Sequence, residues 1–126
     1  MIDYDNLVDI VKHFYNILAK IYSINKEYHE MLDTNNILKI IKQYKTILEE
    51  KYKINKIGFF GSYARGEATQ ESDLDILVEF SKPIGWEFVD FTEFLEEIFQ
   101  HKVDVVTINA LRPQMKDTIL NEVIYA

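Results

Sequence analysis

Two apolar runs joined by a polar loop constrain the fold of this chain more than any other feature of its sequence. Residues 57–60 (IGFF) form a short apolar run that ends at a glycine, which predicts a buried strand. Residues 73–80 (DLDILVEF) alternate in part and then become wholly apolar, which predicts a second strand, half exposed at its start and buried at its end. Residues 102–108 (KVDVVTI) predict a third strand. A small sheet is therefore expected around the loop that joins the first two strands.

Helical periodicity precedes these strands. An apolar stripe with spacings of three and four predicts a first helix, and its members are Leu7, Val11, Phe14, Leu18 and Ile21. A second helix is predicted after the capping residues at 33–36. The first stripe is interpreted either as packing against the rest of the domain or as an interaction face for a partner or a second copy of the chain.

Two more helices complete the predicted elements. Residues 86–99 carry an apolar face, and residues 113–124 form a closing helix with proline in its first turn. The face of the former comprises Trp86, Val89, Phe91, Phe94, Leu95, Ile98 and Phe99. We therefore expect an α/β (α+β) domain at residues 37–126, with a short mixed sheet flanked by helices, preceded by a helical N-terminal extension at residues 1–36.

Composition and charge exclude several classes of function. The chain has 126 residues, the size of one domain, and no cysteine, which excludes disulfides and cysteine-ligated zinc. Residues 57–126 hold thirteen acidic and five basic residues, which argues against a nucleic-acid groove there, because such grooves use Lys and Arg contacts to phosphate. There is no basic and then apolar leader, and no apolar stretch approaches ~18 residues. We therefore expect a cytoplasmic protein without a membrane segment.

The loop after the first strand does not match the common phosphate-binding motifs. Gly61 and Gly66 have the spacing of the P-loop glycines, but Glu67 stands where that motif requires lysine. The glycines do not supply the G-x-G-x-x-G pattern of dinucleotide-binding proteins either. Backbone N–H groups at Gly61 and the hydroxyl of Ser62 can nevertheless cradle phosphate directly after a strand.

Three aspartates suggest how a phosphate could bind in this acidic setting. On a strand, Asp73 and Asp75 point to one face, roughly 6.5–7 Å apart along the chain, and their charges repel unless a cation neutralises them. Mg²⁺ prefers a few carboxylates together with waters and substrate phosphate oxygens. Asp104 is a lone acid within the apolar third strand, so it faces either a core or a functional cleft. The plain alternative is that the first two aspartates are solvated residues at a strand entry.

The spacing of these residues resembles a known superfamily. Gly61-Ser62, ten residues, Asp73-x-Asp75 and a later Asp104 in a strand look like the nucleotidyltransferases of the DNA polymerase β type. The fuller strings GSYARGEATQESDLDILVEF, KVDVVT and ALRPQMKDTILNEVIYA resemble the minimal nucleotidyltransferases, the MntA-type antitoxins that pair with HEPN-domain toxins. The resemblance covers about residues 37–126, and it implies a small polymerase β-like nucleotidyltransferase fold.

The resemblance also implies roles for individual residues. Gly61 and Ser62 would hold the triphosphate of ATP, and Asp73 and Asp75 would ligate two Mg²⁺ ions. Asp104 would complete the metal site and help deprotonate the acceptor hydroxyl. Two ions about 3.5–4 Å apart can clamp the attacking and leaving oxygens of an in-line displacement. Attack on the α-phosphate would release pyrophosphate and leave AMP on the acceptor.

Arg65 is a further candidate for nucleotide binding. It is one of only two arginines, it lies in the loop, and its planar fork suits phosphate oxygens. The alternative interpretation is a surface arginine that pairs with Glu67 or Glu71.

Three functions are consistent with these motifs. The resemblance implies a protein adenylyltransferase antitoxin that transfers AMP from ATP to a tyrosine of a cognate HEPN ribonuclease. The chain lacks the Arg-x(4–6)-His signature of such a ribonuclease, so it is interpreted as the antitoxin. One alternative is a nucleotidyltransferase for a small molecule such as an aminoglycoside. The other is an antitoxin that neutralises its partner by binding alone, without catalysis.

Overall fold

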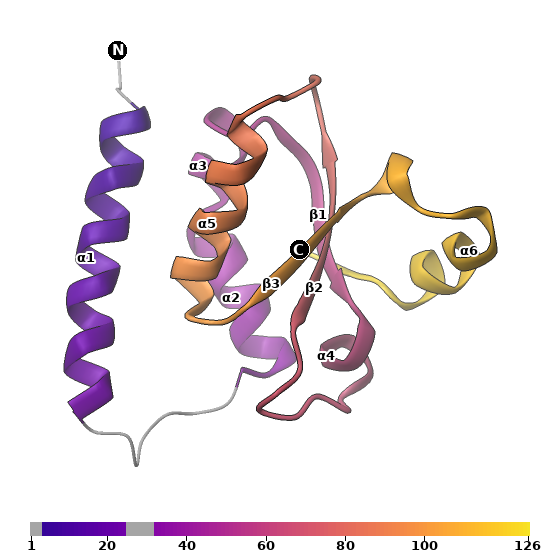
Figure 1. The fold of residues 1–126 in the computed structure, drawn as a ribbon, viewed down its shortest axis with the longest axis horizontal. Coiled ribbons are helices and arrows are strands. Elements are labelled where there is room, and N and C mark those ends of the chain that lie inside the picture. The colour runs from indigo at the N-terminus through magenta and orange to yellow at the C-terminus, as the bar shows by residue number, and fades with distance from the viewer. Residues whose placement is uncertain (1–3, 25–31) are drawn as a thin grey trace.

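The computed structural model describes residues 4–24 and 32–126 and contains a single mixed sheet with helices on both sides (Figure 1). In chain order the elements are α1 (Tyr4–Ile24), α2 (Thr34–Gln43), α3 (Lys45–Glu50), β1 (Ile54–Phe60), α4 (Gly61–Arg65), β2 (Leu74–Phe80), α5 (Glu87–Phe99), β3 (Val103–Thr107), the 3₁₀ helix η2 (Ile108–Ala110), α6 (Pro113–Glu122) and β4 (Ile124–Tyr125). The three predicted strands and the α/β class are confirmed. In the described residues, no helix is long and apolar enough to cross a membrane.

The sheet has the strand order β3-β2-β1-β4. Strand β1 pairs antiparallel with both β2 and β4, whereas β2 and β3 run parallel, so the prediction of a mixed sheet is confirmed. The closing helix was expected to reach Ile124, but α6 ends at Glu122 and the chain continues as β4. The helix ends early because Ile124 pairs with Phe59 of β1, and its backbone hydrogen bonds to β1 replace those of a helix.

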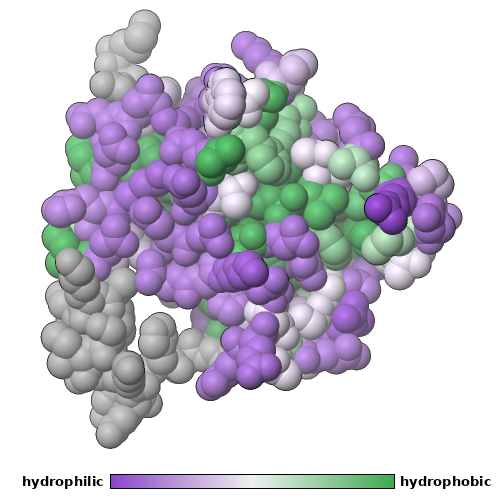
Figure 2. All heavy atoms as spheres, viewed as in Figure 1, coloured by the Kyte–Doolittle hydropathy of each residue, from purple (hydrophilic) through white to green (hydrophobic). Residues whose placement is uncertain are grey.

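Alternation along β2 separates a core face from an open face. Leu74, Ile76 and Val78 belong to the hydrophobic core, which also contains Phe91 and Phe94 of α5. Figure 1 shows α2, α3 and α5 on this side of the sheet and α6 on the other. The odd-numbered residues of β2 therefore point to the other face of the sheet, where Asp75 is half-buried and Leu77 is fully buried. In Figure 2 a band of apolar residues, drawn in green, crosses the strands toward α6 while polar residues dominate the rest of the view.

Helix α1 packs on the helical layer with one face and leaves the other exposed. Val8 is 1% exposed and belongs to the core, and Leu7 and Val11 pack against it. The amine of Lys12 forms an ion pair with Asp90 of α5 at 3.2 Å. Phe14, which was predicted to belong to the same apolar stripe, is 63% exposed. Helical spacing places Phe14 beside the exposed Ile10 and Ile17, and the side chain of Ile21 lies outside the described residues.

The predicted apolar face of α5 is shorter than expected at its start. Phe91, Phe94 and Leu95 are fully buried, but Trp86 is 91% exposed and Val89 is also exposed. The buried residues of α5 recur at spacings of three and four from Phe91 onward, and neither Trp86 nor Val89 stands three or four residues before one of them.

The two faces of α1 predict opposite responses to truncation. Val8→Ala should lower the free energy of unfolding by about 1–2 kcal/mol, because it removes two buried methyl groups and leaves a cavity. Phe14→Ala, at an exposed site, should change it by less than about 0.5 kcal/mol. Urea unfolding monitored by circular dichroism measures both values. Equal losses in the two variants would show that α1 docks in a different rotation.

Candidate active site

The turn between β1 and α4 requires glycine at its first position. Gly61 has φ = +72°, a conformation that favours glycine over residues with a side chain. A Cβ atom there would overlap the Oδ2 atom of Asp75. Gly66 also has φ = +72° and ends α4 as a left-handed cap. The predicted phosphate loop thus lies directly against one of the predicted metal ligands.

Strand register brings two of the three aspartates together. Asp75 is the register partner of Phe60 on β1 and of Asp104 on β3. Neighbouring residues on paired strands project from the same face of the sheet, so the two carboxylates lie side by side on the open face. Asp73 immediately precedes β2 and forms an exposed ion pair with Lys102 at 4.0 Å. Both Asp73 and Asp104 are exposed, whereas Asp75 is half-buried.

The electrostatics of Asp75 reflect this crowding. Burial, together with the negative charges of Asp104 and Asp73, raises the pKa of Asp75 to about 6. The Arg65 guanidinium lowers this pKa, and Glu122 adds a smaller raising contribution. The site therefore carries uncompensated negative charge when Asp75 is ionised, which is the condition a bound cation relieves.

The donor set suits Mg²⁺ in character, although it does not enclose a metal by itself. Within residues 4–24 and 32–126, no three Asp, Glu, His or Cys side chains converge closely enough to hold a metal ion. Mg²⁺ usually takes only one or two protein carboxylates and completes its shell with waters and substrate phosphates. Asp75 and Asp104, with Asp73 nearby, fit that role and do not require a closed protein cage.

Glu122, which the sequence analysis did not single out, joins the phosphate loop to the C-terminal segment. The carboxylate accepts a hydrogen bond from the backbone N–H of Gly61. It also accepts from Nη1 of Arg65, at 3.0 Å to Oε1 and 3.1 Å to Oε2. Arg65 Nε donates to Glu67 at 3.0 Å, so the predicted alternative of a pairing with Glu67 is present in the structure. The predicted closing helix extended through residue 124, so nothing in the sequence indicated that Glu122 lies beside the Gly61 turn.

A second polar contact fixes the loop before Asp73. His101 Nε2 donates to the carbonyl of Ser72 at 2.5 Å and lies 3.0 Å from the hydroxyl of buried Tyr63. The carbonyl can only accept, so its bond assigns the proton to Nε2. Tyr63 belongs to the hydrophobic core, and Ser62 lies half-buried just before it at the start of α4.

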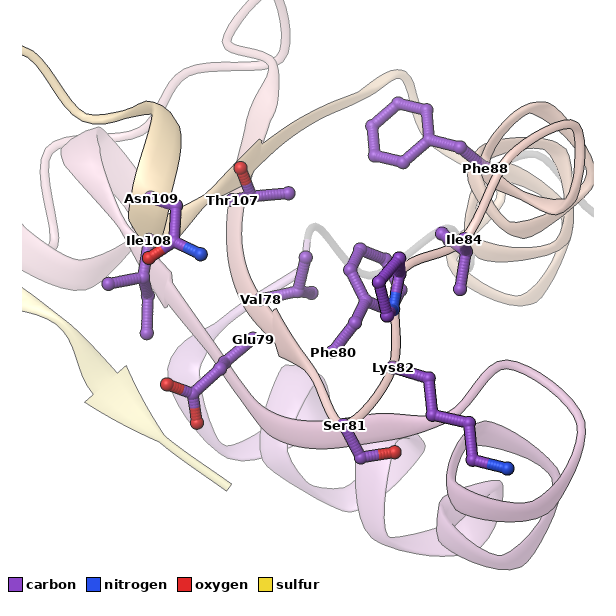
Figure 3. Close-up of a pocket in the computed structure, with 11 residues that line it drawn as sticks. Val78, Glu79, Phe80, Ser81, Lys82, Ile84, Phe88, Thr107, Ile108 and Asn109 are labelled. Carbon is purple, nitrogen blue, oxygen red and sulfur yellow. The ribbon is translucent and has the colours of Figure 1, made fainter.

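A separate concavity lies at the other end of β2 and lacks the chemistry of this site. It has a volume of about 430 Å³ and is shown in Figure 3. Its lining mixes polar and apolar residues and comprises Val78, Glu79, Phe80, Ser81, Lys82, Pro83, Ile84, Phe88, Thr107, Ile108 and Asn109. Because it contains neither the Gly61 turn nor the aspartates, the candidate active site is the open face at the start of β2.

The raised pKa of Asp75 predicts a pH-dependent effect on stability. An unfolded Asp titrates near pH 4, so the folded state binds more protons between pH 4 and 6, and stability falls as pH rises through that window. Asp75→Asn should therefore raise the free energy of unfolding by about 1 kcal/mol at pH 8, a value discounted for partial solvent exposure. At pH 4 the gain should vanish.

Urea unfolding in EDTA at both pH values tests this expectation. Asp117→Asn, at an exposed position of α6, is the matched control and should change stability by less than about 0.5 kcal/mol at either pH. A gain for Asp75→Asn that is the same at pH 4 and pH 8 would contradict the electrostatic origin.

Comparison with known proteins identifies the family. Residues 41–126 match the nucleotidyltransferase domain family. Protein adenylyltransferase MntA of Thermococcus cleftensis is 44% identical over 71 residues, which cover 56% of this chain and 72% of that protein. A solved minimal nucleotidyltransferase superposes with a TM-score of 0.61 at 28% identity, over 75% of this chain and 97% of the other. A toxin–antitoxin structure with AMP-PNP shares the fold, with a TM-score of 0.54 at 21% identity, over 75% of this chain and 72% of that one. The chain belongs to the nucleotidyltransferase family and is a nucleotidyltransferase enzyme.

Proposed function

We propose that this enzyme is an antitoxin that transfers AMP from ATP to a tyrosine hydroxyl of a HEPN-domain ribonuclease toxin and so neutralises it. The observation that carries the proposal is the register of Asp75 beside Asp104 beneath the Gly61 turn. This arrangement joins a candidate phosphate loop to a candidate metal site on one open face. The choice of ATP and of a protein acceptor is supported by the name of the Thermococcus relative, a protein adenylyltransferase.

Solved structures of the same fold support the antitoxin assignment. One is the toxin–antitoxin pair MntA–HpeT, and another is a toxin–antitoxin structure with AMP-PNP, an ATP analogue. Both are under 25% identical to this chain, so they establish a shared fold and suggest the partner class. The HEPN identity of the partner and the tyrosine acceptor come from the resemblance in the Gly-Ser and Asp-x-Asp strings.

Each site residue has a role in the proposed reaction. Asp73, Asp75 and Asp104 would hold two Mg²⁺ ions. When bound, these ions would neutralise charge at the reacting phosphate. Gly61, Ser62 and Arg65 would orient the triphosphate. Asp104 would also accept the proton of the acceptor hydroxyl. The hydroxyl oxygen bonds to the α-phosphorus as the bond to pyrophosphate breaks, so AMP remains on the acceptor.

The mass of the partner protein tests the proposal directly. Incubation of the co-expressed HEPN-domain protein with this enzyme, ATP and Mg²⁺ should add one or more AMP units, detected by intact mass spectrometry. Asp73→Ala/Asp75→Ala should abolish the gain, because it removes two of the proposed metal ligands. Glu71→Gln, an exposed acid two residues from Asp73, is the matched control and should leave the gain intact.

Two other results would redirect the assignment. A stable complex without any mass gain would favour neutralisation by binding alone. Transfer of AMP to an aminoglycoside, with none to the protein, would favour the small-molecule enzyme.

The exposed stripe of α1 is the surface we propose for association with a second copy of the chain. Ile10, Phe14 and Ile17 are 56%, 63% and 46% exposed and share one helix face. Phe14→Glu should convert an associated species to a monomer in sedimentation-velocity experiments at equal protein concentration. The matched change Asn16→Glu, on the same helix but outside the stripe, should not. A wild-type protein that sediments as a monomer throughout would end this proposal.

A further inference from the structure

The side chain of Glu122 contacts both the Gly61 turn and Arg65. Its side chain is only 17% exposed. It accepts from the backbone N–H of Gly61, while Nη1 of Arg65 approaches both oxygens, at 3.0 and 3.1 Å. Hydrogen bonds to a charged carboxylate are stronger than those to a neutral acceptor. This carboxylate therefore ties the first and last residues of α4 to the C-terminal segment.

The backbone around Glu122 is held by the sheet. Tyr125 and Ile124 pair with Gly58 and Phe59, and the N–H of Ala126 donates to the carbonyl of Ile57 at 3.0 Å. Continuing the same antiparallel register by two residues places Glu122 opposite Gly61. The approach is close because Gly58 has no side chain: a Cβ there would lie 2.6 Å from the carbonyl oxygen of Ile124.

The position of Glu122 is electrostatically unfavourable. It adds a carboxylate to a region where Asp73, Asp75 and Asp104 already repel one another. A structural tether to one backbone N–H could be made by a neutral amide without this repulsion. The charge matters at Arg65, whose guanidinium it orients. Arg65 carries five N–H donors, and its contacts with Glu67 and Glu122 engage Nε and Nη1.

We propose that Glu122 is a positioning residue for nucleotidyl transfer. It holds the Gly61 turn against Asp75 and aims the Arg65 guanidinium at the triphosphate. This inference rests on the proposed function, because it assumes that Gly61 and Arg65 meet ATP. Glu122 itself touches neither nucleotide nor acceptor in this assignment. The same geometry admits an opposite role, in which the carboxylate occupies the phosphate position and must be displaced.

Nucleotide affinity and turnover distinguish these roles. In Glu122→Ala, kcat/KM for ATP should fall about tenfold, mainly through a higher KM, and ATP affinity in the presence of Mg²⁺, measured by isothermal titration calorimetry, should weaken in parallel. Glu122→Gln should restore part of the loss, since an amide oxygen can still accept from Gly61. Glu67→Gln is the matched control. It removes the charge of the other carboxylate that pairs with Arg65, at an exposed position, and its kcat/KM should stay within about twofold of wild type.

A double variant shows whether Glu122 acts through Arg65. In an Arg65→Gln background, Glu122→Gln should cause little further loss, because coupled residues are not additive. Additive losses, or Glu122 variants with unchanged kinetics, would overturn the inference. An increase in ATP affinity would assign the carboxylate to blocking. A loss explained by the folded fraction alone, measured by thermal unfolding, would make it structural.

The controls separate failure of this inference from failure of the proposed function. If the wild type transfers AMP to its partner and the Glu122 variants match it, only the inference fails. If the wild type binds ATP but transfers nothing to the partner, the calorimetric comparison still decides the role of Glu122. If the wild type binds no ATP, the proposed function fails and the inference is overturned with it.

Discussion

The close approach of the Gly61 turn to Asp75 is the constraint on which the site depends. The antiparallel register of β1 and β2 brings Phe60 opposite Asp75, so the next residue must turn directly over that carboxylate. Only glycine can make this turn, because φ is positive and a Cβ atom would overlap Asp75. Moving the turn by one residue would separate the candidate phosphate loop from the candidate metal ligands.

Burial of the apolar residues of β2 makes this crowding tolerable. The helical layer buries Leu74, Ile76 and Val78 of β2, while Asp75 on the opposite face stays half-buried. Hydrophobic burial on one face thus stabilises a strand whose other face carries mutually repelling charges. Destabilising charge retained against such a background is typical of functional sites, where local rules of stability are broken for chemistry.

Much of the fold could be predicted from the sequence because apolar runs and turn residues act locally. The runs at residues 57–60 and 73–80 identified two strands that the structure extends or trims only at their ends. The exposure of Phe14 could not be predicted, because apolar residues covered more of α1 than its neighbours bury. Periodicity shows that a helix has an apolar arc, but packing against α5 decides which part of the arc is covered.

The aspartates were predicted as candidates from their spacing, but their mutual placement depends on strand pairing. No local pattern shows that Asp104 is the register partner of Asp75, since β3 follows only after α5. Glu122 was missed for a related reason. Its neighbours Val123 and Ile124 continue a helical spacing from Ile119 and Leu120. The absence of a side chain at Gly58 instead lets this segment approach β1, where Ile124 begins β4.

The charge balance of the site bears on the form of nucleotide it can accept. Of the charged groups that shift the pKa of Asp75, Arg65 favours ionisation, while Asp104, Asp73 and Glu122 oppose it. Arg65 is itself shared between Glu67 and Glu122. Because the positive charge of Arg65 is already paired with carboxylates, the negative charge of free ATP would be repelled by this surface. ATP that arrives with divalent cations reverses the sign of that interaction, because the carboxylates that repel the nucleotide attract its metal. On the proposed function, the acidic surface would therefore select the metal-bound nucleotide.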